Sequence, residues 1–248
     1  MLYSKEFVEI VKNGVGNYYI GIGNPDANIL IVGKESAISD DKIDDKISYR
    51  NNASDWDKHI EDNTCQTLSY LVHKKGDKNL DNEIFDKDHP LFKGWGRNTW
   101  SKYQQLYDFI NGYKTQKFYV NFLKNVFTTE INDSPSPKTS SANKKGLSQR
   151  KELFKNSAFI QKFPVVVLAC SDYIDNVNAK EINEIFGVTY DGDEKGKHLY
   201  SSGNWFYTHH DSTGQKLVIH TRQLSANVDG KMLEDMGKVI REHLKQHS

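Results

Sequence analysis

Glu35, Asn121 and His220 each follow a short apolar run that has the composition of a buried strand. A carboxylate at such a position can orient a water molecule or stabilise a developing cation. An amide carries donors and an acceptor, so it can read the polar edge of a nucleobase. An imidazole can donate a hydrogen bond to an oxyanion. Each of these side chain types can therefore bind a ligand or take part in acid–base chemistry at the end of a strand.

Each of these residues also has an ordinary structural interpretation. Glu35 can be a surface carboxylate in a charged loop, and Asn121 a loop amide that caps the next turn. His220 can be a core histidine whose ring is satisfied by a backbone carbonyl, which is the commoner fate of a lone histidine. Arg222 can pair with a phosphate or form an ordinary surface salt bridge.

The elements expected to position these residues are strands that alternate with helices. Apolar runs at 29–32, 118–120, 164–170 and 217–219 indicate strands, and helical spacing indicates helices at 99–110, 148–159, 177–186 and 228–244. Residues 34–56 are polar and charged and are expected to form a long loop. The pattern predicts one α/β domain over residues 1–248: a three-layer sandwich around a mostly parallel sheet of four or five strands. Ligands of such sheets bind beyond the carboxyl ends of the strands.

Composition narrows the classes of function. The chain has 248 residues, with 33 Lys and Arg against 33 Asp and Glu, so no global basic field attracts nucleic acid. Nucleic-acid binding therefore needs a local patch. The longest apolar run, residues 165–170, is too short to span a bilayer, and the charged N-terminus is unlike a secretory signal. We expect a cytoplasmic protein with no membrane partner.

Metal and cofactor binding are not expected. Cys65 and Cys170 are too few for an iron–sulfur cluster or a cysteine zinc site, and we interpret them as reduced thiols. His209, His210 and Asp211 are potential ligands, but adjacent residues of a strand point to opposite faces. The sequence therefore predicts neither a metal site nor a cofactor.

The order of these segments resembles the uracil-DNA glycosylase superfamily over about residues 20–240. Residues 24–35 are similar to the first motif of the family and its lead-in, and residues 90–94 to its aromatic segment. Residues 118–121 resemble the strand that ends in the base-reading Asn. Residues 220–225 resemble the last motif, which begins with the catalytic His.

The resemblance implies an enzyme that hydrolyses the N-glycosidic bond of a uracil-like base flipped out of DNA. Glu35 would handle the attacking water, and His220 would stabilise the departing base anion. Phe92 would stack on the flipped base and Asn121 would read its edge. The remaining substrate-binding residues expected from the motifs are Gly33, Lys34, Arg222 and Ser225.

Departures from the family pattern keep other functions open. Ser36 and Thr221 stand where the family usually has proline, and Lys34 stands where one branch has an acidic residue. One alternative is a non-catalytic module on the same fold that binds a nucleobase, a nucleotide or a nucleic acid. Another alternative is an unrelated α/β enzyme that uses Glu35 and His220 on a small-molecule substrate.

Overall fold

A mixed β-sheet runs through the centre of the molecule in the computed structural model, which describes residues 2–38, 41–62, 94–115, 117–175, 180–225 and 227–247. Its strand order is β1-β3-β2-β4-β8-β7-β5, and β6 pairs with β7. The strands are β1 (Ile22–Gly23), β2 (Ile29–Gly33), β3 (Phe127–Glu130), β4 (Val165–Leu168), β5 (Thr189–Tyr190), β6 (Lys197–Leu199), β7 (Trp205–His210) and β8 (Leu217–Thr221).

The four central strands β3, β2, β4 and β8 are mutually parallel, whereas the flanking strands β1, β5, β6 and β7 are antiparallel to their neighbours. β2 and β4 are buried along their whole length and consist largely of β-branched residues, as parallel strands covered on both faces usually do. The predicted α/β class is confirmed. The sheet is larger than the four or five strands expected, because short antiparallel strands extend both of its edges.

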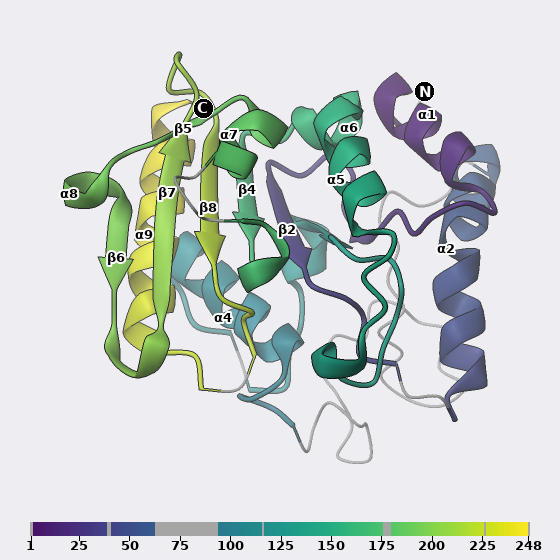
Figure 1. The fold of residues 1–248 in the computed structure, drawn as a ribbon, viewed down its shortest axis with the longest axis horizontal. Coiled ribbons are helices and arrows are strands. Elements are labelled where there is room, and N and C mark those ends of the chain that lie inside the picture. Colours follow the sequence, from purple (N-terminus) through teal and green to yellow (C-terminus); the bar gives the residue numbers. More distant parts are fainter. Residues whose placement is uncertain are drawn as a thin grey trace.

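Helices cover both faces of this sheet (Figure 1). Helices α4 and α9 pack against each other on one face, while α5, α6 and α7 lie on the other. The helices are α1 (Lys5–Gly14), α2 (Ile43–Asp62), α4 (Thr99–Asn111), α5 (Leu147–Asn156), α6 (Ala158–Gln161), α7 (Lys180–Phe186), α8 (Asp193–Gly196) and α9 (Gly230–Gln246). Their caps follow local chemistry: Asn98 accepts from Ser101 N at the start of α4, and Gly112 ends that helix in the left-handed conformation.

Two expectations about local structure are wrong. The expected loop at 34–56 is largely helix α2, which buries Tyr49, Asn52, Ala53 and Trp56 at helical spacing among exposed charges. The Asn52 side chain accepts hydrogen bonds from the backbone N–H groups of Ile20 and Gly21 and donates one to the Gly21 carbonyl. The spacing of apolar residues in the sequence does not reveal such long-range hydrogen bonds. Tertiary contacts therefore explain why this polar segment is helical.

The second wrong expectation is the strand at 118–120. Phe118 has φ +67°, a left-handed conformation that an aromatic residue rarely adopts and that cannot continue a strand. The strand that pairs with β2 is β3, which begins later in the chain and carries the buried residues Thr128 and Thr129. Their hydroxyls donate to the carbonyls of Ile22 and Ile20, which satisfies them inside the sheet.

Phe127 of β3 lies at the centre of an aromatic cluster in the core. Its ring packs against Phe7, Trp56, Phe159 and Phe163, with centroid distances from 5.2 to 6.2 Å. These partners belong to or flank α1, α2 and α6, so one β3 side chain ties three helices to the sheet. Aromatic side chains bury large areas and dominate the energetics of such cores.

We expect Phe127→Ala to lower the free energy of unfolding by about 3–5 kcal/mol, because it leaves a cavity among the other rings. Urea unfolding followed by circular dichroism measures the change. Leu199→Ala is the control, because that side chain is 64% exposed and its removal creates no cavity. Equal unfolding midpoints for the two variants would show that the cluster does not stabilise the fold.

Candidate functional site

The carboxyl ends of β3, β2, β4 and β8 meet at one edge of the sheet, because these strands are parallel and in register. The chain leaves β2 toward β3 on one side and leaves β4 toward β8 on the other. The crevice beyond β2 and β4 is therefore a topological switch point, where ligands of open α/β sheets bind. Gly33, Lys34 and Glu35 enter it from β2, and Ser171 to Tyr173 enter it from β4.

An ion pair joins the two loops across this crevice. Lys34 Nζ lies 2.7 Å from Asp172 Oδ1 and 4.6 Å from the centre of the Tyr173 ring. The Lys34 side chain is buried, and the hydrogen bond that it donates holds the pKa of Asp172 below its ordinary value. The ammonium group of Lys144 lies over the same ring at 4.3 Å. Two cations thus flank Tyr173 at the rim of the site.

Glu35 lies at this edge of the sheet and is only 8% exposed. The Thr139 hydroxyl donates to its Oε1 at 2.8 Å, but its Oε2 is buried and accepts no hydrogen bond. The Tyr173 hydroxyl and the Asn132 amide nitrogen are buried beside it, and the Tyr173 hydroxyl interacts with both the Glu35 carboxylate and the Asn132 side chain. Burial, followed by the nearby Glu35 carboxylate, raises the pKa of Tyr173, so this hydroxyl keeps its proton.

A second carboxyl group lies at the end of β3. Glu130 pairs in register with Gly33, and its Oε2 is buried without a hydrogen-bond partner. Burial and the charge of Glu35 raise the pKa of Glu130 to about 8. Buried polar groups normally find partners, and perturbed carboxyls cluster at functional sites. The cluster of buried polar atoms on Glu35, Glu130, Asn132 and Tyr173 marks this edge as the candidate site.

His220 lies at the end of β8, on the same edge of the sheet as Glu35. Its Nε2 lies 2.9 Å from the carbonyl oxygen of Ser171, so this nitrogen donates. Burial lowers the pKa of His220 to about 4, so the ring is neutral at pH 7 and its buried Nδ1 carries no proton. In this geometry the imidazole has no N–H left for a departing anion. A role for His220 in catalysis stays a prediction.

The other sequence-predicted residues lie at different places. Asn121 precedes β3 instead of following a strand, and its side chain accepts from Gln104 on helix α4, which corrects the expected placement at the strand end. Phe92 lies outside the described residues. Arg222 and Ser225 follow β8 and are partly buried. Their expected contacts with substrate stay predictions.

Sequence reasoning missed Glu130, Asn132, Thr139 and Tyr173. Glu130 ends β3 and Asn132 follows it, and the two threonines of this strand hid it from a search for apolar runs. The sequence held one usable signal, because Val126 and Phe127 precede two β-branched threonines, a composition that favours strands. Tyr173 belongs to the 3₁₀ turn Ser171–Tyr173 directly after β4, a position where ligand-binding residues are common.

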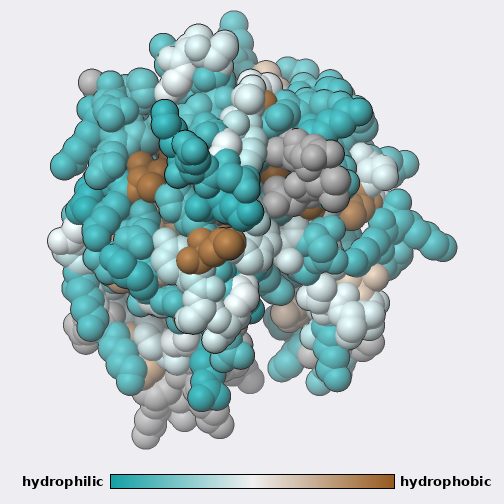
Figure 2. Space-filling view, turned by 60° about the vertical axis from the view of Figure 1, so that its left-hand side comes forward, coloured by the Kyte–Doolittle hydropathy of each residue, from teal (hydrophilic) through white to brown (hydrophobic). Residues whose placement is uncertain are grey.

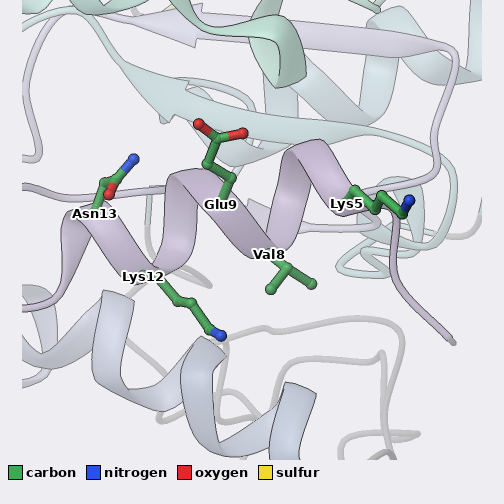
Figure 3. A pocket seen from close by; sticks show the side chains of 5 residues that line it. All are labelled: Lys5, Val8, Glu9, Lys12 and Asn13. Atoms are coloured by element: carbon green, nitrogen blue, oxygen red, sulfur yellow. The ribbon is translucent and has the colours of Figure 1, made fainter.

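Other surfaces of the described chain offer less chemistry. A hollow of about 340 Å³ runs along α1, and Figure 3 shows that Lys5, Val8, Glu9, Lys12 and Asn13 line it from this single helix. All but Val8 are exposed, so their charges are solvated. Among the described residues, no group of three or more His, Cys, Asp or Glu is arranged to hold a metal ion.

The face drawn in Figure 2 is mainly hydrophilic, with hydrophobic side chains in separate small patches. Within the described ranges, every helix is too short or too polar to cross a membrane.

Comparisons with known proteins assign the chain to no family. No protein-family model matches the chain, and no curated protein sequence matches it.

The neutral, buried state of His220 makes stability depend on pH. The unfolded chain takes up a proton near pH 6.5, whereas folded His220 stays neutral until about pH 4, so stability falls as pH falls between these values. Between pH 7 and pH 5, His220 alone lowers the free energy of unfolding by on the order of 2 kcal/mol. We expect His220→Gln to remove that contribution when urea unfolding is compared at the two pH values.

His209 provides the matched comparison, because it is also buried and burial lowers its pKa to about 4. His209→Gln should remove its own contribution and leave that of His220 in place. An unchanged pH dependence in His220→Gln would mean that the imidazole takes up its proton at the same pH in the folded and the unfolded chain.

Proposed function

We propose that this chain hydrolyses the N-glycosidic bond of a uracil-like base flipped out of nucleic acid, on a fold of the uracil-DNA glycosylase type. The observation that carries the proposal is the Glu35 carboxylate at the switch point of the sheet, which is 8% exposed and faces the buried Tyr173 hydroxyl. A carboxylate in that state is suited to hold a water molecule and to accept its proton.

The proposed reaction uses the geometry of the crevice. Thr139 fixes Glu35 through Oε1, which leaves Oε2 to orient water toward the sugar carbon that carries the base. The carboxylate also stabilises the positive charge that develops on the sugar as the bond to the base breaks. Asn132 takes the role expected of Asn121, because its buried amide nitrogen, beside the Tyr173 hydroxyl, can donate to a carbonyl on the base edge.

Two further features support a nucleic-acid substrate. The motifs around Glu35 and His220 that resemble the glycosylase superfamily both follow parallel strands and reach the same edge of the sheet. Lys144 at the rim is half exposed and lies 3.9 Å from Asp172, where an incoming phosphate can compete for its ammonium group. Because the net charge of the chain is zero, such local cations supply the attraction to phosphate.

We expect Glu35→Gln to slow the release of uracil from single- or double-stranded DNA by about 100-fold or more, because a positioned acid or base contributes 10²–10⁴-fold. Chromatography of the released base measures the rate. Glu242→Gln on the exposed face of α9 makes the same chemical change far from the crevice and should keep the wild-type rate. Equal rates for Glu35→Gln and wild type would remove Glu35 from the mechanism.

The geometry of His220 favours a second candidate, a module that binds a nucleobase or nucleic acid without turnover. Its ring donates to Ser171 and has no N–H for a leaving anion. In that case, no base is released from any substrate, and oligonucleotides bind saturably with an affinity that falls as salt rises. Asn132→Ala, which removes the buried amide, should weaken that binding.

A further inference from the structure

Glu130 lies at the same edge of the sheet as Glu35 and Asn132, and the reaction proposed above gives it no role. It is the last residue of β3 and stands beside Gly33 in the parallel ladder. A methyl group on Gly33 would overlap the Glu130 Oε2 atom, so the glycine leaves room for the carboxyl at this point. That oxygen is buried and makes no hydrogen bond. Nothing in the ladder explains why a carboxyl group should be held there.

The groups that face Glu130 favour its neutral form. Glu35, from the loop after β2, is the acidic neighbour, and its charge opposes ionisation of Glu130. The nearby cation is Arg150 of α5, whose Nε and Nη2 donate to the Glu130 carbonyl and to the Thr129 hydroxyl. The guanidinium is therefore engaged by groups other than the carboxyl. Burial is the largest effect, and with Glu35 it raises the pKa of Glu130 to about 8.

Three further titratable neighbours among the described residues carry no charge near neutral pH. They are Tyr49 of α2, Tyr103 of α4 and Cys170 after β4. Burial raises the pKa of each, that of Cys170 to about 12. Burial and the Glu35 carboxylate therefore favour the protonated form of Glu130 near neutral pH. Two carboxyls in different protonation states are the arrangement that acid–base hydrolysis of glycosidic bonds requires.

We propose that Glu130 is the general acid of the reaction and donates its proton to the leaving base. This inference rests on the proposed function. Water held by Glu35 forms a bond to the sugar carbon, and the bond from that carbon to the base nitrogen breaks with its electron pair going to the base. The base takes the proton of Glu130, and Glu35 takes the proton of the water. Proton transfer between the two carboxyls restores the starting state.

Proton donation changes which bases can leave. A base that departs as an anion needs a hydrogen-bond donor to stabilise it. The one N–H group of His220 already donates to the Ser171 carbonyl. A base that departs neutral does not depend on how well it carries negative charge. We therefore expect uracil and the more acidic 5-fluorouracil to be released at similar rates, and the substrate class to extend to bases that are poor anionic leaving groups.

The test compares wild type and Glu130→Gln on DNA that carries either base, from pH 5 to pH 10. Glutamine keeps a donor and an acceptor but cannot give up a proton. We expect wild-type activity to fall as pH rises through about 8, where Glu130 ionises. In Glu130→Gln the rate near pH 6 should drop by about 100-fold or more. This decline with pH should disappear, and 5-fluorouracil should leave faster than uracil. Glu242→Gln is again the control.

Carbon-13 NMR of chain labelled at the glutamate carboxyls gives an independent readout, with Glu130→Gln used to assign the resonance. A Glu130 signal that titrates near pH 8 agrees with the proposal, and one that titrates near pH 4.5 overturns it. Base release with unchanged pH dependence in Glu130→Gln overturns this proposal alone. If wild type releases no base from any substrate, the proposed function fails and the general acid with it.

Discussion

The parallel pairing of β2 with β3 on one side and with β4 on the other is the constraint on which the site depends. Leu30 of β2 is in register with Phe127 and with Val166, so the three strands end together. The loops that follow must then share one small volume above the sheet. Because β2 is buried along its whole length, a shift in register would move the loop carrying Glu35 away from its neighbours.

Glu35 and Glu130 occupy an edge where apolar side chains would cost less free energy. Buried carboxyls and amides without partners oppose folding, and a structure retains them where they have a use. The Lys34–Asp172 pair keeps the loops after β2 and β4 together over these groups. The loops after β2 and β4 are therefore linked beside the buried polar atoms.

The sequence predicted the parts of the fold whose composition is unambiguous. β2 and β4 are apolar runs rich in β-branched residues, and α4 and α9 have apolar faces with clear caps. β3 was not predicted, because the hydroxyls of Thr128 and Thr129 donate to distant carbonyls and the sequence alone does not reveal these bonds. Glu35 was found because it directly follows a strand, whereas its neighbours come from loops more than 90 residues away. Only the pairing of the strands brings them together.

The most direct test of this account is a crystal structure with a single-stranded oligonucleotide that carries a 2′-fluoro-2′-deoxyuridine, whose glycosidic bond resists hydrolysis. The account predicts that the uracil ring lies beyond β2 and β4, with a water on Glu35 Oε2 and the Asn132 amide at the base edge. A uracil bound elsewhere, with Glu35, Asn132 and Tyr173 still closed around an empty edge, would contradict it.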